Sequence, residues 1–181
     1  AACGAPSHPK AVIELVGPLQ VETYLIPSQD VLSQRMVVTA CGSPVGLTKY
    51  GTTMSAVFSR ATSAWEGFFG PEGEERLAGL RLTGVNVPVD TTISYQPGAT
   101  DSALSLTWHF LSRILLQPGN RAEFMVRMNV VGGPESSPAS IEACYQMNLG
   151  SFEVLDLNTA EAATALWAGS GTPMQTCFVT P

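Results

Sequence analysis

Two histidines are the side chains of this sequence best suited to acid–base or metal chemistry near neutral pH. His8 lies in a proline-flanked N-terminal segment, and His109 lies on the polar side of an alternating run. A catalytic triad needs a histidine base, and a zinc site needs several His, Cys or carboxylate ligands together. Neither histidine has such partners nearby in the sequence. We therefore interpret His109 as a solvent or interface residue and predict no metal site.

The motifs of nucleophilic and carboxylate catalysis are missing from the sequence. Gly42-Ser43-Pro44-Val45-Gly46 has the wrong spacing for a nucleophile elbow, and Asp90-Thr91-Thr92 lacks the glycine of an aspartic-protease loop. Glu72, Glu74 and Glu75 lie in a glycine-rich stretch that is typical of a solvated loop. The chain has only four Asp, which disfavours a carbohydrate hydrolase. The sequence predicts a protein that is not an enzyme and binds no cofactor.

The four cysteines are Cys3, Cys41, Cys144 and Cys177, and no two lie within 30 residues of each other. This spacing excludes the CxxC pairs of common zinc sites. The last three lie in apolar runs, so we interpret them as buried thiols that pack as small hydrophobic residues. The alternative is a secreted domain with two disulfides. The sequence leaves free and paired thiols open.

Three tryptophans are candidates for either core packing or contacts with a partner. Trp108 alternates with apolar neighbours and is predicted to lie in the core. Trp65 lies in a short apolar patch with Phe68 and Phe69, and Trp167 ends an expected helix. Because aromatic residues are enriched at interface centres, we name Trp65, Phe68, Phe69 and Trp167 as possible subunit-contact anchors. Packing inside the core remains the alternative for each.

Composition indicates a folded protein whose surface is mostly neutral and polar. The chain has 181 residues, 45% of them hydrophobic and 13% charged, with a formal net charge of −6. Soluble domains usually have about 25% charged residues. A surface with so few charges fits burial against neighbouring proteins. No basic run is present, so strong direct binding of nucleic acid is not expected. No segment is typical of a transmembrane span.

Alternation of apolar and polar residues is the dominant pattern and predicts β-strands. The clearest case is 103–131, where two alternating runs flank Gln117-Pro118-Gly119-Asn120. Pro followed by Gly favours a type II turn, so we predict an antiparallel hairpin. The other expected strands are 11–16, 19–26, 35–41, 52–60, 77–87, 91–95, 141–149, 152–157 and 174–180.

Helical signals are few. A short helix is expected from Asn158 to Gly169, and single turns are possible at 63–66 and 28–34. Many short strands and long polar loops predict an all-β fold, a single eight-stranded antiparallel jelly-roll β-sandwich with one or two short helices. We expect one domain over 1–181, with an N-terminal arm at 1–10 and a C-terminal strand or tail at 171–181.

The whole-chain pattern resembles the small capsid proteins of plant picorna-like viruses, the secovirid group of comoviruses, fabaviruses and cheraviruses. The features that carry this resemblance are a jelly-roll-sized β domain, the start Ala1-Ala2-Cys3-Gly4 as if cut from a polyprotein, and framework-like runs such as 104–110 and 121–131. The basic arm of many other plant-virus coat proteins is missing, which also matches this group.

The resemblance implies a structural virion protein, a viral polyprotein product that assembles with other capsid subunits into an icosahedral shell. The shell would enclose genomic RNA, with direct contact from this acidic subunit weak or absent and no membrane partner. Before assembly, the protein would be in the cytoplasm of the host cell.

The rival hypothesis is a secreted β-sandwich binding module that is stapled by disulfides. It would hold a ligand with the loops 42–51, 96–102 and 132–140. Two observations separate the hypotheses. Free thiols and a large native particle favour the capsid subunit, whereas paired cysteines and a soluble monomer favour the module.

Overall fold

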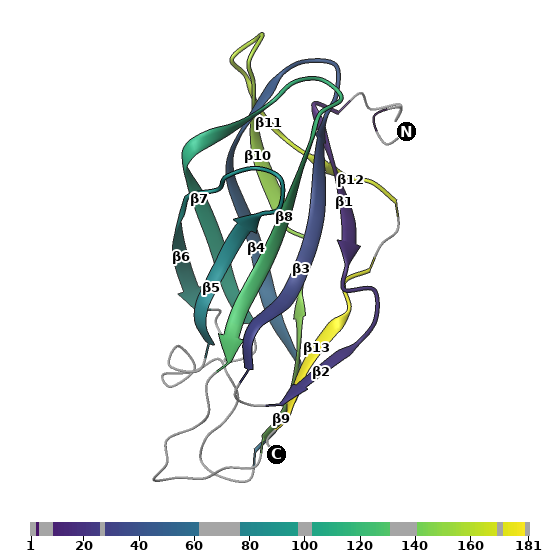
Figure 1. Cartoon of the computed structure of the whole chain (residues 1–181), viewed down its shortest axis with the longest axis vertical. Helices are drawn as coiled ribbons and strands as arrows, with labels where there is room; N and C mark the ends of the chain where they lie inside the picture. Colours follow the sequence, from purple (N-terminus) through teal and green to yellow (C-terminus); the bar gives the residue numbers. More distant parts are fainter. Residues whose placement is uncertain are drawn as a thin grey trace.

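Two facing β-sheets form the described part of the chain in the computed structural model (Figure 1). The structure describes residue 3 and residues 9–25, 28–61, 77–97, 103–130, 141–169 and 172–179. These residues form thirteen strands and no α-helix. The predicted all-β sandwich is therefore confirmed, whereas the predicted count of eight strands and the short helices are not.

The five-stranded sheet has the order β12-β1-β3-β8-β5. Its strands are β12 (Leu166–Trp167), β1 (Ala11–Gly17), β3 (Ser28–Ala40), β8 (Arg121–Val130) and β5 (Leu77–Gly84). Neighbouring strands pair antiparallel except β1 and β12, which are parallel. The late strand β12 therefore forms the edge of this sheet beside the first strand.

The eight-stranded sheet has the order β11-β10-β4-β9-β13-β2, with β7 paired to β4 and β6 paired to β7. Its strands are β11 (Ala162–Thr164), β10 (Ser151–Asp156), β4 (Val45–Ala61), β9 (Ile141–Met147), β13 (Gln175–Val179), β2 (Glu22–Leu25), β7 (Ala103–Leu116) and β6 (Thr91–Pro97). The long strand β4 is central, because its first half pairs with β10, its second half with β9, and β7 runs along its other edge.

The turn at Gln117–Asn120 joins the two sheets and does not close a hairpin. The Asn120 N–H donates to the Gln117 carbonyl at 2.9 Å, and Gly119 has a φ of 83°, as the sequence predicts. However, β7 pairs with β4 and β6, whereas β8 pairs with β3 and β5. The predicted hairpin is wrong, because alternation identifies the buried face of each strand but not the sheet to which it belongs.

The segment 157–169 is a turn followed by two short strands, so the predicted helix is wrong. Backbone N–H groups of Asn158 and Thr159 donate to the Asp156 carboxylate, and Ala160 has a φ of 59°. Asn and Asp favour such turns as strongly as helix caps. The expected turn at 28–34 is likewise part of β3, and 63–66 lies outside the described residues.

Aromatic rings fill the centre of the sandwich between the two sheets. Phe124 of β8 and Phe152 of β10 have ring centroids 5.3 Å apart, and Tyr50 of β4 lies 4.4 Å from Phe152. Trp108 of β7 is fully buried beside Tyr50, so its predicted place in the core is confirmed. These rings pack the two sheets against each other, so the alternate residues of the same strands lie on the outer faces.

Candidate functional site

All four cysteines are paired in disulfides. Cys3 is bonded to Cys41, which follows β3, and Cys144 of β9 is bonded to Cys177 of β13. The second pair occupies directly opposed positions in the antiparallel ladder. The interpretation as buried thiols is therefore wrong, and the cysteine pairing of the alternative is confirmed. Sequence spacing could not decide this, because the partners lie 38 and 33 residues apart.

Asp156, at the end of β10, connects three segments at one end of the sandwich. Its buried carboxylate lies 2.9 Å from the Lys10 ammonium and accepts a hydrogen bond from the Ser43 hydroxyl at 3.3 Å. It also accepts the backbone N–H groups of Asn158 and Thr159, at 2.9 and 3.4 Å. The hydrogen bond from Lys10, with support from these amides, lowers the pKa of Asp156 to about 2 although burial opposes the shift.

We expect this carboxylate to stabilise the fold in a pH-dependent way. Because its folded-state pKa of about 2 lies below the ordinary value of 3.8, the stabilisation is complete above about pH 4 and is lost as the pH falls towards 2. Asp156→Asn should lower the melting temperature at pH 7 and flatten its dependence on pH between 4 and 2. Thermal unfolding by circular dichroism at several pH values measures both effects.

Glu153→Gln is the matched control, because Glu153 lies on β10 like Asp156 and forms an exposed ion pair with Lys49 of β4. Exposed pairs contribute little, so its melting temperature should stay close to that of the wild type. An Asp156→Asn variant with the wild-type pH profile would contradict the role given to Asp156.

A chain of hydrogen bonds crosses the core between the two sheets. The Tyr50 hydroxyl in β4 donates to the side-chain oxygen of Gln34 in β3, and Gln34 Nε2 donates to the Asn148 carbonyl at 3.1 Å. The Gly150 N–H donates to the Tyr50 oxygen at 3.3 Å, and the Trp167 indole donates to the Gly150 carbonyl at 2.6 Å. Burial raises the pKa of Tyr50 far above its ordinary value, so the phenol remains a donor.

Removal of this hydroxyl should weaken the fold. Tyr50→Phe leaves the Gln34 oxygen and the Gly150 N–H without their partner in the core, at a cost of about 1–3 kcal/mol. Urea unfolding of the wild type, Tyr50→Phe, Gln34→Leu and the double variant tests this. We expect the double variant to lose less free energy of unfolding than the sum of the single changes. Strictly additive losses would mean that the two side chains do not stabilise each other.

The predicted contact anchors fall in two groups. Trp65, Phe68 and Phe69 lie outside the described residues. Trp167 lies in β12, half-buried against the core, and its indole N–H is bonded to Gly150. The anchor role of all four residues stays a prediction, and for Trp167 it is limited to the part of the ring that remains exposed.

Among the residues that the structure describes, the candidates for catalysis or metal binding do not lie together in one site. His109 lies exposed on β7, opposite Lys49 of β4 and Thr92 of β6. His8 and the three clustered glutamates lie outside the described residues. Across the described ranges, no three His, Cys, Asp or Glu side chains lie close enough together to hold a metal ion. The same ranges contain no helix that is long and apolar enough to cross a membrane.

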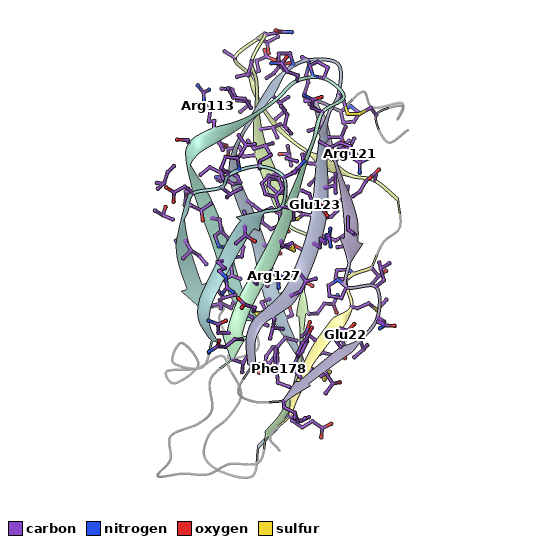
Figure 2. The ribbon with its side chains drawn as sticks, in the orientation of Figure 1. Glu22, Arg113, Arg121, Glu123, Arg127 and Phe178 are labelled. Carbon is purple, nitrogen blue, oxygen red and sulfur yellow. A yellow bond between two sulfur atoms is a disulfide. The ribbon has the colours of Figure 1, made fainter. Side chains whose placement is uncertain are left out.

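Four of the seven arginines lie on the outer face of the five-stranded sheet, in part visible along β8 in Figure 2. They are Arg35, Arg81, Arg121 and Arg127. Asp30 organises two of them, because its carboxylate pairs with Arg81 and its carbonyl accepts a hydrogen bond from Arg127 at 2.8 Å. Arg35 pairs with Glu123. The face is therefore a mixture of charges, in which two arginines already have a carboxylate partner.

A cavity of about 520 Å³ opens on the surface beside a bend in β7. Four residues of β7, 110–113, bulge opposite a single residue of β4 as the ladder passes from His109 to Ile114. The segment 87–90, which leads into β6, forms one wall, and 112–115 forms the other. The volume lies within the range of about 300–1,000 Å³ that is typical of ligand sites. The bulge thus creates a hollow that a regular ladder would not have.

The cavity is mainly apolar. Leu115 in its wall is 62% exposed, and Leu111 of the same strand, which is not a lining residue, is 61% exposed. Arg113 and Asp90 line the cavity, and neither forms an ion pair with any residue that the structure describes. A cavity of this kind suits an apolar group that is flanked by polar or charged atoms.

The sequence did not predict this cavity. The ligand loops of the rival hypothesis were 42–51, 96–102 and 132–140, but Val45–Tyr50 belongs to β4, and 98–102 and 132–140 lie outside the described residues. A signal was present after Phe110, where Leu111 and Leu115 place apolar side chains on the polar face of the strand.

Comparison with known proteins does not assign a family to this chain. No protein-family model matches it, and no curated protein sequence matches it significantly. Among solved structures, it is similar to AvmM, which catalyses macrocyclization in alchivemycin A biosynthesis. The identity is 15%, over 94% of this chain and 88% of AvmM, with a TM-score of 0.40.

Two further similar structures come from bacteria. One is a cohesin module from the family 33 glycoside hydrolase of Clostridium perfringens, 4% identical over 96% of this chain and 99% of the module, with a TM-score of 0.40. The other is the CssB subunit of the CS6 colonization factor of enterotoxigenic Escherichia coli, 12% identical over 95% and 97% of the two chains, with a TM-score of 0.30. With scores this low, none of the three carries an argument about function.

Proposed function

We propose that this protein is a secreted or surface-exposed β-sandwich binding module that is stapled by two disulfides. The observation that carries the proposal is the pairing of all four cysteines, Cys3 with Cys41 and Cys144 with Cys177. Disulfides persist in oxidising compartments and are rare in the cytosol. The exposed side chain of Leu115 in the cavity wall, together with the exposed Leu111 of the same strand, supports a binding role, because exposed apolar patches mark interaction sites.

The test is the thiol state of the protein in its native source. Cells are lysed in an excess of iodoacetamide, and the intact mass of the protein is measured before and after reduction. The proposal expects no cysteine alkylated before reduction and all four alkylated after reduction and a second treatment. Four alkylated cysteines without reduction would overturn it.

A capsid subunit is the second candidate function, and the low charged content of 13% favours it. Extensive burial against neighbouring subunits would account for such a surface. The native particle mass separates the two candidates. Particles of megadalton mass that contain nucleic acid and partner chains would support the capsid subunit, and species that contain this chain alone and no nucleic acid would support the module.

A further inference from the structure

We infer that the cavity beside β7 binds the exposed segment between β1 and β2 of a second copy of this chain, in a head-to-tail arrangement. This inference rests on the proposed binding role and names the partner of that site. We call the segment 18–21 the knob. The knob and the cavity lie on opposite sides of the sandwich, as Figure 1 shows from the positions of β1, β2, β6 and β7.

The knob is the most exposed apolar feature in the described part of the chain. Leu19 is 72% exposed and Val21 is 53% exposed, and both project from the connection between two strands. Leaving such side chains in water has a cost that burial in an apolar cavity would remove. The cavity walls offer the matching surface, because Val87, Val89 and Leu115 are apolar.

The polar groups that flank the two surfaces offer one pair of opposite charges and one pair of a hydrogen-bond donor and an acceptor. Glu22 directly follows the knob, and its carboxylate is held by the side-chain amide of Gln20 at 3.3 Å. The cavity presents Arg113 and Asp90, which lack an ion-pair partner among the described residues. A docked knob would bring Glu22 towards Arg113 and the Gln20 amide towards Asp90. Complementary charges of this kind fix the orientation of a contact.

The separation of the two surfaces determines the type of assembly. Figure 2 places Arg113 and Glu22 far apart, on opposite sides of the molecule, so one copy cannot fill its own cavity. Two copies joined in this way keep one free knob and one free cavity. The contact is therefore heterologous, and it extends into a chain or closes into a ring.

Two variants remove the two halves of the contact without touching the core. Leu19→Glu destroys the knob and keeps the cavity, whereas Leu115→Glu, at a side chain that is 62% exposed, places a charge on the cavity wall and keeps the knob. Leu25→Glu is the matched control, because Leu25 is 60% exposed on β2 but lies outside the knob. Circular dichroism and melting temperature establish that all three variants fold.

Sedimentation velocity of the oxidised full chain over a range of concentrations is the readout. The wild type and Leu25→Glu should associate progressively, and each of the other two variants should need at least about a tenfold higher concentration. An equimolar mixture of Leu19→Glu and Leu115→Glu should form dimers and nothing larger. The intact knob of Leu115→Glu fills the intact cavity of Leu19→Glu, and the dimer then has no intact knob or cavity left. The double variant Leu19→Glu/Leu115→Glu has neither an intact knob nor an intact cavity. It should stay monomeric and, when mixed with Leu25→Glu, leave the association of Leu25→Glu unchanged.

Three results would overturn the inference. They are a wild type that stays monomeric at all concentrations, an unchanged association of Leu115→Glu, and a mixture of the two variants without dimers. A monomeric wild type with all four cysteines paired would leave the proposed function standing with another ligand in the cavity. If the cysteines are free in the native source but the two variants form dimers when mixed, the proposed oxidising compartment is overturned and the contact between copies is supported.

Discussion

Gly150→Ala should unfold the protein or reduce its free energy of unfolding by at least about 3 kcal/mol. A Cβ atom at this position would lie 2.2 Å from the Gly51 carbonyl oxygen and 2.8 Å from both Tyr50 Cζ and Thr52 Cβ. The backbone of β4 cannot yield at this point, because β4 is paired on both edges. The change would also displace the two hydrogen bonds that Gly150 forms with Tyr50 and Trp167.

Gly51→Ala is the matched control for this change. A Cβ at Gly51 would meet Thr107 Oγ1 at 3.6 Å, an ordinary contact, in the strand directly beside Gly150. Because alanine restricts the unfolded chain, this variant should be neutral or more stable by up to about 1 kcal/mol. Urea unfolding of both variants under oxidising conditions makes the comparison. Equal stability of the two variants would contradict the close packing at Gly150.

Loss of the two disulfides should have the second large effect. They close segments of 38 and 33 residues, for which the chain-entropy model gives a stabilisation of about 4 kcal/mol each. A domain of this size has a total stability of about 5–15 kcal/mol, so reduction of both should leave it close to unfolding at 37 °C. Thermal unfolding with and without a phosphine reductant measures the loss.

Paired alanine variants separate the contributions of the disulfides. Cys3→Ala with Cys41→Ala frees the N-terminal segment, whereas Cys144→Ala with Cys177→Ala cuts a link within one sheet. We expect each double variant to lose about 2–4 kcal/mol and to show no further change on reduction beyond that of its remaining disulfide. A melting temperature of the oxidised wild type that does not respond to reductant would contradict a stabilising role.

The alternating pattern predicted most strands but not their arrangement. The polar and apolar sides of 121–130 were assigned correctly, as the burial along β8 confirms. The partner of that strand could not be predicted, because β7 and β8 direct apolar side chains into the same core from opposite sheets. Strand pairing depends on contacts between distant segments, and a single sequence carries no direct record of them.

The candidate site was predictable only in fragments. The composition indicated an interaction surface, but the cavity depends on the bulge at 110–113, whose register against β4 has no simple sequence signature. The prediction of a helix from Asn158 was wrong for a related reason, which is a contact between residues far apart in sequence. Asp156 accepts the turn amides and Lys10 at the same time, and the second contact links residues far apart in sequence.

The parallel pairs at the sheet edges have a consequence for the way the chain reaches its fold. Val12 of β1 pairs with Leu166 of β12, and Glu22 of β2 pairs with Thr176 of β13. Contacts between such distant residues slow folding to milliseconds or seconds, because a long loop must close before they form. During synthesis β1 and β2 are made long before β12 and β13, so the edges that later pair with these strands are unpaired. Unpaired strand edges of this kind promote aggregation of the nascent chain.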